Sequence, residues 1–293
     1  MQQTVAYLRA VRDEAPPPSD DPAQALRALR ERAEFIATLY PAPSDVRVEP
    51  VDADGVRADL LTPPDADEKH VLLYLHGGAY VAYSPRSHRE LAARIARAAG
   101  CVALVPDYRL APEHPYPAAV DDAVTALHWL RAQGRRVVLA GDSAGGGLAL
   151  ALAQRLRDAG AERPAAIALL SPWTDLLLTG PSVSAVEDDP TLDAERLRGA
   201  GLSYAGNADP TGPELSPVNA DLTGLPPLHV EVGTGEILMS DSIRLVDVAA
   251  AAGNAVTLEL GEDLPHVFQV FANTPEAVAS TDRIGAFLRR SLG

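Results

Sequence analysis

Several residue types are scarce in this chain of 293 residues, and each scarcity excludes a class of protein. Cys101 is the single cysteine, so no intramolecular disulfide can form and a cysteine-based metal site is not expected. No stretch of the sequence approaches the roughly 18 uninterrupted apolar residues that a membrane helix needs. The formal net charge of −15 disfavours nucleic acid and membrane surfaces as partners, because such a field repels phosphate groups.

Two further absences concern location and chemistry. The N-terminal stretch 1–20 has no basic segment followed by an apolar one, so a secretory signal is not expected, and with the single cysteine this favours the cytoplasm. Lys69 is the only lysine, which leaves no lysine for a phosphate-binding loop elsewhere in the chain. Cys101 opens the apolar run CVALVP and is therefore predicted to be a small buried side chain.

From residue 71 onward, short apolar runs alternate with helical patterns. The runs are Val71–Leu75, Val102–Val105, Val137–Ala140, Ala166–Leu170, Leu228–Val232 and Val256–Leu260. A helix lies between most pairs of runs; residues 118–132, for example, place Val120, Leu127 and Leu130 on one face. Apolar strands that alternate with helices indicate an α/β fold with a parallel sheet covered on both faces.

The remaining segments suggest a hairpin and a cap. After a Pro/Asp-rich break at 15–22, residues 23–39 have the spacing of an amphipathic helix. The runs VRVEPV and VRADLLT are joined by DADG, and an Asp-Gly pair between such runs predicts a hairpin. The interval 180–226 is rich in Gly, Pro, Asp and Ser and has no apolar strand, which indicates an insertion. We predict that this insertion and the helices of residues 1–44 form a cap on a catalytic domain of residues 45–293, at the strand ends where open α/β sheets bind ligands.

The segment after the third apolar run carries the strongest functional signal. It reads Gly-Asp-Ser-Ala-Gly-Gly-Gly (141–147) and leads into the helix-forming run LALALAQRLRDAG, which places Gly-x-Ser-x-Gly between a strand and a helix. Glycines are needed on such a sharp turn, where side chains would collide with neighbouring backbone. The turn lifts the hydroxyl of Ser143 above the sheet at a helix N-terminus, where negative charge is stabilised. The alternatives are a plain glycine-rich connection and a phosphate loop, but no Gly-Lys-Ser/Thr follows.

A second glycine motif follows the strand Val71–Leu75. The strand runs directly into His-Gly-Gly, where the amides of Gly77 and Gly78 have no side chain to shield them. Together with the amide of Ala144 they are predicted to converge on one oxygen atom and to form an oxyanion hole. His76 is expected to be a structural imidazole, because the motif acts through its backbone. The alternative is a glycine turn without a catalytic role.

The general base and its acid must come late in the chain, since the order on this fold is serine, acid, histidine. Of seven histidines, His266 lies in the loop after the last apolar run, whereas His229 lies within a buried strand and His128 on a helix. The acid should follow the strand before it. Glu236 stands in the loop directly after that strand, and Asp241 begins the next helix, where it would be an ordinary first-turn residue. Both carboxylates are candidates, and the loop position favours Glu236.

Three motifs in this order resemble the bacterial hormone-sensitive-lipase-like esterases: His-Gly-Gly at 76–78, Asp-Tyr-Arg-Leu-Ala-Pro-Glu at 107–113 and Gly-Asp-Ser-Ala-Gly-Gly at 141–146. Ser-Pro-Trp-Thr-Asp at 171–175 and Leu-Pro-His at 264–266 fit as well. The resemblance implies the α/β-hydrolase fold with a helical cap, short- to medium-chain acyl esters as substrates, and neither a cofactor nor a metal. Members of that family are often dimers, so a homodimer is a further expectation, although the sequence marks no interface.

The resemblance also assigns two structural roles and exposes two departures. Asp107 and Arg109 are expected to form an ion pair beneath the site. Ala79 stands where the family has a third glycine, which leaves the shape of that loop open. The usual acid of the family is aspartate, but the matching position, counted back from the helix-ending Gly253, falls on Glu236.

The predicted reaction is hydrolysis of a carboxylic ester through an acyl-enzyme. Ser143, deprotonated by His266, attacks the ester carbonyl; an alcohol leaves, and water then cleaves the acyl-enzyme. A deacetylase or lactonase of one metabolite is an alternative with the same chemistry. A non-catalytic small-molecule receptor is an alternative of another class, since the gibberellin receptors resemble this family but lack the histidine. A true lipase is disfavoured, because aromatic residues make up only 5% of the chain and no lid rich in large apolar residues is visible.

Overall fold

The computed structural model describes residues 1–14, 19 and 21–293. Most of the predicted break at 15–22 therefore lies outside the described residues. Helix α2 (Pro22–Leu39) begins at the last residue of that break and matches the predicted helix to within one residue. Asp21 caps this helix, because its carboxylate accepts the backbone amide two residues on at 3.0 Å.

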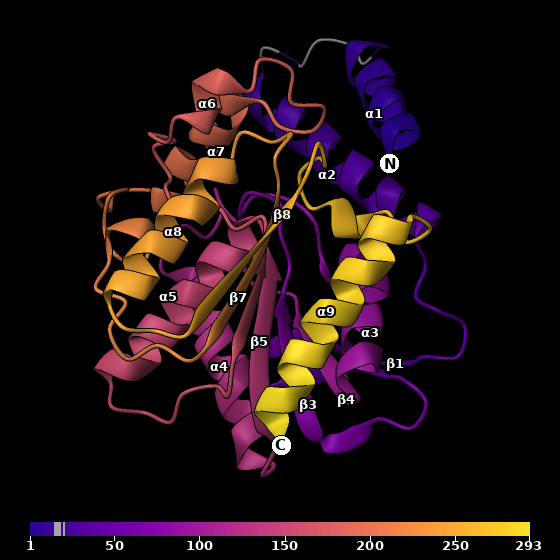
Figure 1. The fold of residues 1–293 in the computed structure, drawn as a ribbon, viewed down its shortest axis with the longest axis vertical. Helices are drawn as coiled ribbons and strands as arrows, with labels where there is room; N and C mark the ends of the chain where they lie inside the picture. Colours follow the sequence, from indigo (N-terminus) through magenta and orange to yellow (C-terminus); the bar gives the residue numbers. More distant parts are fainter. Residues whose placement is uncertain (15–18, 20) are drawn as a thin grey trace.

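The strands of the described chain form one eight-stranded sheet in the order β1-β2-β4-β3-β5-β6-β7-β8 (Figure 1). Their bounds are Arg47–Ala53 (β1), Val56–Thr62 (β2), Asp67–Leu75 (β3), Cys101–Pro106 (β4), Arg136–Asp142 (β5), Ile167–Leu170 (β6), Leu228–Gly233 (β7) and Val256–Gly261 (β8). Strands β3 to β8 pair in parallel, whereas β2 is antiparallel to both β1 and β4. The prediction of a mostly parallel sheet is confirmed, and the six predicted apolar runs are β3 to β8.

β1 and β2 form the hairpin that the sequence predicts, with Ala53 opposite Val56. The two loop residues, Asp54 and Gly55, have φ values of 55° and 94°. A two-residue loop with positive φ at both positions is what a type I′ turn requires, and Asp-Gly adopts it at low cost. The Gly55 amide also donates to the carboxylate of Asp52 at 2.5 Å.

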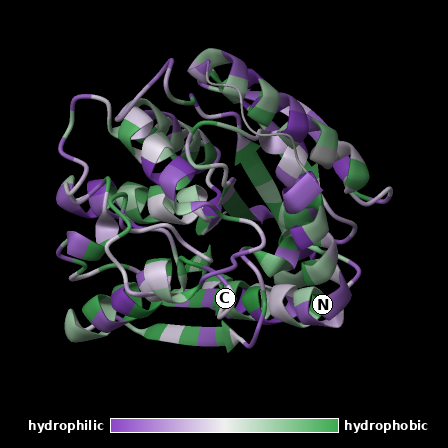
Figure 2. Ribbon diagram, turned by 90° about the horizontal axis from the view of Figure 1, so that it is seen from above, coloured by the Kyte–Doolittle hydropathy of each residue, from purple (hydrophilic) through white to green (hydrophobic). Residues whose placement is uncertain are grey.

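Helices cover both faces of the sheet, and the strand residues alternate between two cores. The bounds of these helices are Pro85–Ala99 (α3), Ala118–Ala132 (α4), Ala144–Asp158 (α5), Met239–Ala251 (α8) and Pro275–Leu292 (α9). Along β3, Val71, Leu73 and Leu75 belong to the core under α4, α5 and α8, while Leu72 and Tyr74 belong to the core under α3 and α9. Figure 1 shows these two helical layers on opposite sides of the sheet, and Figure 2 shows mainly hydrophobic strands between helices of mixed colour.

Cys101, the single cysteine, is fully buried at the start of β4. Burial raises the pKa of its thiol to about 12, so the reactive thiolate is not formed at neutral pH. The prediction of a small buried side chain is confirmed.

The segments predicted as a cap lie together at one end of the molecule. The chain between β6 and β7 contains α6 (Ser182–Ala185), α7 (Ala194–Ala205) and a short 3₁₀ helix, Pro217–Asn219. Figure 1 shows α6 and α7 at the upper end of the sheet, together with α1 (Gln2–Glu14) and α2. In the part of the chain that the structure describes, no helix combines the length and the apolar character needed to span a membrane.

Each of the two N-terminal helices contacts a loop at this end. On α1, Arg12 donates to the carboxylate of Asp188 at 2.7 Å and to the backbone oxygen of Asp189 at 2.9 Å. On α2, Arg30 donates to the backbone oxygen of Val81 at 2.8 Å and forms two hydrogen bonds of 2.8 Å with the carboxylate of Glu113. Through these hydrogen bonds, α1 contacts the insertion and α2 contacts the loop after β3.

The predicted ion pair between Asp107 and Arg109 is wrong. Arg109 instead binds Asp122 on α4, with hydrogen bonds of 2.7–3.0 Å from the guanidinium and one of 2.8 Å from its own backbone amide. Asp107 pairs with the exposed Arg57 at 3.2 Å. The buried carboxylate of Asp122 accepts both the guanidinium and the backbone amide of Arg109, which leaves the carboxylate of Asp107 to pair with Arg57.

Candidate active site

Ser143 lies at the turn between β5 and α5, where the backbone conformation is strained. Its φ and ψ values are 53° and −122°, a region that residues with a side chain rarely adopt. A Cβ atom on Gly141 would lie 2.3 Å from the backbone oxygen of Gly145, and one on Gly145 would lie 2.0 Å from that of Leu75. Both glycines are therefore required by close backbone contacts, as the sequence motif predicts, and these contacts hold the turn against the end of β3.

The loop after β3 contains the two predicted glycine donors, Gly77 and Gly78. Of these two, only Gly78 has an amide without a hydrogen-bond acceptor among the described residues. Gly77 donates its N–H to the carboxylate of Asp142 at 3.1 Å, so the structure contradicts its predicted role in the oxyanion hole. Among the described residues, none accepts from the amides of Gly78 and Ala79. Ala144 is the first residue of α5, where no acceptor within the helix exists for its amide. Because only the two glycines of the motif were read as donors, the amide of Ala79 was not among the predicted ones.

His76 holds this loop in place and stays neutral. Its Nδ1 atom contacts the backbone oxygen of Gly77 at 2.7 Å, and its ring stacks on Tyr108 with 4.2 Å between centroids. Burial, with a smaller effect of nearby His88, lowers the pKa of His76 to about 3. A permanently neutral imidazole packed inside the fold agrees with the predicted structural role.

His266 and Glu236 are in direct contact, His266 Nδ1 with Glu236 Oε2. Glu236 lies in the loop after β7 and is fully buried, while His266 lies in the loop after β8. The second oxygen of Glu236, Oε1, accepts hydrogen bonds from the hydroxyl of Ser171 at 2.6 Å and from the amide of Gly233 at 3.0 Å. The same Ser171 hydroxyl accepts the amide of Val267 at 3.1 Å. Ser171 thus joins the loop of the carboxylate to the loop of the imidazole.

Asp241, the other candidate acid, points into a different environment. Its Oδ2 accepts the backbone amides of Thr174 and Asp175 at 2.8 and 2.9 Å, and its Oδ1 is buried without a hydrogen-bond partner among the described residues. Burial raises the pKa of Asp241 to about 7, although the two amides oppose the shift. The structure therefore brings Glu236, and not Asp241, to His266.

The charge state of His266 is set by opposing effects. Burial lowers its pKa, because desolvation disfavours the imidazolium. The charge of Glu236 and its hydrogen bond raise the pKa, with smaller contributions from Asp189 and Asp142, and the net direction is upward. A histidine stabilised in this way by a buried carboxylate can accept a proton at Nε2 while Nδ1–H stays bound to Glu236.

The other histidines named above lie outside this constellation. His229 is buried in β7, where it contacts Glu231 at 2.9 Å and Thr257 at 2.8 Å and stacks on Phe287 of α9. His128 is exposed on α4. Within residues 1–14, 19 and 21–293, no group of three or more His, Cys, Asp or Glu side chains is arranged to hold a metal ion.

Sequence reasoning missed two residues that support the site, Ser171 and Asp189. Ser171 directly follows β6, and the position after a strand end beside the nucleophile strand was a signal that could have found it. Asp189 lies in the insertion, and its carboxylate accepts the amide of Ile237, the residue after Glu236, at 2.9 Å. No local pattern distinguishes it from the other acidic residues of that segment.

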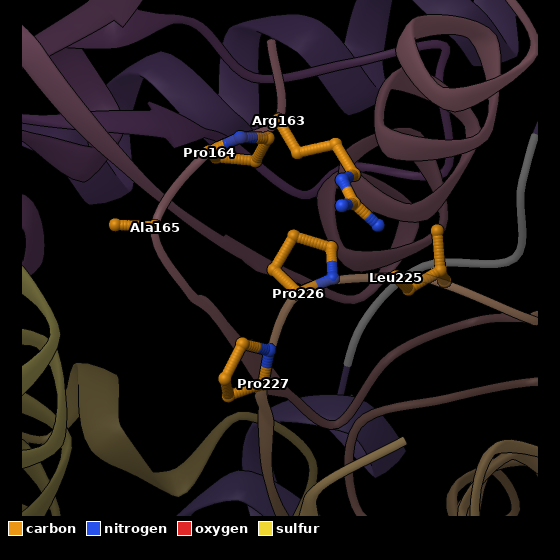
Figure 3. A pocket seen from close by; sticks show the side chains of 6 residues that line it. All are labelled: Arg163, Pro164, Ala165, Leu225, Pro226 and Pro227. Carbon is orange, nitrogen blue, oxygen red and sulfur yellow. The ribbon is translucent and has the colours of Figure 1, made fainter. Parts of the chain in front are cut away.

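A shallow surface pocket lies at the opposite end of the sheet. This pocket of about 390 Å³ is lined by Arg163, Pro164, Ala165, Leu225, Pro226 and Pro227 (Figure 3). These residues precede β6 and β7, whereas Ser143, Glu236 and His266 follow β5, β7 and β8. Its lining has a single charged side chain, which donates to a backbone oxygen of the neighbouring loop. It is therefore separate from the candidate active site.

Comparison with known proteins identifies the family of this chain. The family model described as alpha/beta hydrolase fold matches residues 72–270. The chain is 44% identical over 273 residues to an acetyl-hydrolase of Streptomyces hygroscopicus, covering 91% of this chain and 90% of the relative. It is 35% identical over 267 residues to an esterase of Acinetobacter venetianus, covering 89% and 88%.

Solved structures give the same result. A crystal structure of an esterase from the bacterial hormone-sensitive lipase family superposes with a TM-score of 0.93 at 42% identity, covering 100% of this chain and 98% of that one. The esterase EstE5, whose crystals were soaked with p-nitrophenyl butyrate, gives 0.93 at 38% identity, covering 100% and 99%. The chain therefore belongs to the alpha/beta-hydrolase fold family and, within it, to the bacterial hormone-sensitive-lipase-like esterases.

Proposed function

We propose that this protein hydrolyses carboxylic esters with short- to medium-chain acyl groups, with Ser143 as nucleophile, His266 as general base and Glu236 as its acid. The observation that carries the proposal is the contact between His266 Nδ1 and Glu236 Oε2, on the loops that follow β7 and β8, at the same edge of the parallel sheet as the strained turn of Ser143 after β5. This combination of nucleophile, imidazole and buried carboxylate is what acyl transfer through serine requires.

In the proposed mechanism, His266 Nε2 accepts the hydroxyl proton of Ser143 as Oγ attacks the ester carbonyl. The negative charge on the carbonyl oxygen is stabilised by backbone amides, for which Gly78, Ala79 and Ala144 are the candidates; Gly77 is replaced because its amide is bound to Asp142. The protonated imidazole then gives its proton to the leaving alcohol. Water attacks the acyl-enzyme by the same sequence, which releases the acid and restores the serine.

The substrate range is supported by the relatives. One relative at 44% identity is named an acetyl-hydrolase, and one structural neighbour was soaked with p-nitrophenyl butyrate, an ester with a four-carbon acyl group. Both names refer to short acyl chains. The acetyl-hydrolase also favours a second candidate function, deacetylation of one metabolite, which uses the same residues and differs only in the alcohol. A non-catalytic receptor is disfavoured because His266 is present and bound to a buried carboxylate.

We further propose that residues 1–44 and 180–226 act as the cap of this site and thereby select a small-molecule ester. Their helices lie at the end of the sheet where the loops of the candidate triad lie (Figure 1). We propose a cytoplasmic location on the basis of the single buried cysteine. Fractionation of the native host, followed by detection of the protein in the soluble cell extract or the culture medium, tests this location.

The function is tested by hydrolysis of p-nitrophenyl esters from acetate to palmitate by the wild-type protein and by Ser143→Ala. We expect cleavage of the short esters by the wild type, a decline of kcat/KM for long acyl chains, and loss of turnover in Ser143→Ala. A wild-type protein that cleaves no ester of the series would overturn general esterase activity. Cleavage of an acetylated metabolite alone would support the second candidate.

A further inference from the structure

The backbone of Ile237, the residue that follows Glu236, is held at both its N–H and its carbonyl oxygen by the insertion. The N–H of Ile237 donates to the carboxylate of Asp189 at 2.9 Å. The carbonyl oxygen of Ile237 accepts the hydroxyl of Ser182 at 2.5 Å. Asp189 and Ser182 are 5% and 2% exposed, so these hydrogen bonds are shielded from water and are costly to break. The insertion therefore fixes both polar groups of the residue next to the proposed acid.

Asp189 is itself held in one orientation. In the part of the chain that the structure describes, its Oδ2 accepts the amide of Ile237 alone, while its Oδ1 accepts the amide and hydroxyl of Thr191 and the amide of Leu192, at 2.8, 2.8 and 2.9 Å. All four contacts are accepted by the carboxylate, as expected for its ionised form. On its outer side, the backbone oxygen of Asp189 accepts the guanidinium of Arg12 on α1. This carboxylate is thus a rigid negative charge between the insertion and the loop of Glu236.

We propose that Asp189 is a positioning residue, which holds Glu236 against His266 from the insertion and adds a second negative charge near the imidazole. The proposal rests on the proposed function. The charged groups that act on the His266 ring are Glu236 in the loop after β7, Asp189 in the insertion and Asp142 at the end of β5, and all three raise its pKa against the effect of burial. Removal of one of these charges lowers the pKa of His266, so its neutral form persists to lower pH.

The decisive variant is Asp189→Asn, with Asp188→Asn as its matched control. Both remove one negative charge from adjacent positions, but the Asp188 side chain is 49% exposed and, among residues 1–14, 19 and 21–293, binds only Arg9 and Arg12 on α1. Asparagine at 189 must turn an NH₂ group toward one of the amides that Asp189 now accepts, which displaces the loop. We expect kcat on p-nitrophenyl butyrate to fall about 10- to 100-fold with little change in KM, since small misplacements of catalytic groups have such effects.

The pH profile separates positioning from a loss of stability. In Asp189→Asn the acidic limb of kcat/KM, which reports the free enzyme's base, is expected to move to lower pH, and in Asp188→Asn it is expected to stay in place. A merely structural residue would lower the melting temperature but leave the limb and kcat per folded molecule unchanged. That result for Asp189→Asn, or an equal shift of the limb in Asp188→Asn, would overturn the proposal.

A second variant covers the case in which Asp189→Asn does not fold. Ser182→Ala removes the hydroxyl that donates to the carbonyl oxygen of Ile237 and accepts the amide of Ser240 at 3.0 Å, without a change of charge. We expect kcat to fall about 3- to 30-fold, as for a small misplacement of the acid, while the acidic limb stays where it is. An unchanged kcat refutes the idea that the insertion positions the acid. If the wild type itself is inactive, the proposed function fails. If the wild type is active and these variants have its kcat and its acidic limb, this inference alone fails.

Discussion

Replacement of Glu236 by glutamine tests the choice between the two candidate acids, and the structure allows its consequence to be worked out. Glu236 Oε1 accepts two hydrogen bonds, from Ser171 and Gly233, so the carbonyl oxygen of the amide must occupy this position. The amide nitrogen is then left facing His266 Nδ1. An NH₂ group can only donate there, so Nδ1 must lose its proton and Nε2 must carry one. The imidazole is then in the tautomer that cannot accept the proton of Ser143.

The expected loss is large for so small a change. A triad with the wrong histidine tautomer loses about ten-thousandfold in kcat, which is about 5 kcal/mol of transition-state stabilisation at 1.36 kcal/mol per tenfold. Asp241→Asn is the matched control, because it is the same change at the other candidate. Its Oδ2 accepts two backbone amides that an amide oxygen can also accept, and it does not contact His266. Its kcat is expected to remain within about tenfold of wild type, since only the support of the loop is altered.

The assay is steady-state hydrolysis of p-nitrophenyl butyrate with circular dichroism and melting temperature as checks of folding. Ser143→Ala gives the background that both variants are compared with. A Glu236→Gln protein that is folded and retains kcat within tenfold of wild type refutes the argument from the tautomer. A folded Asp241→Asn protein that falls to the background refutes the assignment of the acid.

Two predictions concern stability. Ala79 has a φ of 53°, where a Cβ atom is strained, so Ala79→Gly is expected to raise the free energy of unfolding by about 0.5–1 kcal/mol and to leave kcat within twofold; urea unfolding that shows a loss contradicts this. The pKa of Asp241 is about 7 when folded and near 3.8 when unfolded, so its stabilising neutral form is present at pH 4 and is lost as the pH rises through 7. The Asp241→Asn protein lacks this titration, so its free energy of unfolding, relative to that of the wild type, should rise by about 4 kcal/mol between pH 4 and pH 8. Urea unfolding at both pH values measures this change. A difference between the two proteins that is the same at pH 4 and pH 8 contradicts the shifted pKa.

The features that were predictable from sequence are those with a local cause. The apolar runs identified the parallel strands because a strand buried on both faces needs no polar residue. The hairpin was predictable because Asp-Gly adopts positive φ at both positions of its loop. The position of Ser143 was predictable because Gly141 and Gly145 lie so close to neighbouring backbone that neither position has room for a side chain. In each case the required conformation is encoded within a few residues.

Partner choice was not predictable in the same way. Arg109 binds Asp122 and not Asp107, because α4 presents its carboxylate to both the amide and the guanidinium. The amide of Gly77 is taken by Asp142, a residue of the nucleophile motif itself that lies 65 positions further along the chain. These contacts join separate segments of the chain, so they depend on how the strands and their loops are arranged in the folded protein. The preference for Glu236 over Asp241 rested on its place in the loop, and its contact with His266 could be seen only once the strands were assembled.

The supports of Glu236 come from several separate parts of the chain, and this has a consequence for the proposed enzyme. Its carboxylate is held by Ser171 after β6 and by Gly233 of β7, whereas the peptide beside it is held by two residues of the insertion. The insertion is also the segment proposed to select the substrate. A substitution in the insertion that enlarges the proposed substrate-binding site therefore also alters the orientation of Glu236, unless both hydrogen bonds to the backbone of Ile237 are kept. In the proposed enzyme, substrate range and catalytic rate are therefore coupled through the backbone N–H and carbonyl oxygen of Ile237, and the two can be varied separately only by changes in the insertion that leave Asp189 and Ser182 in place.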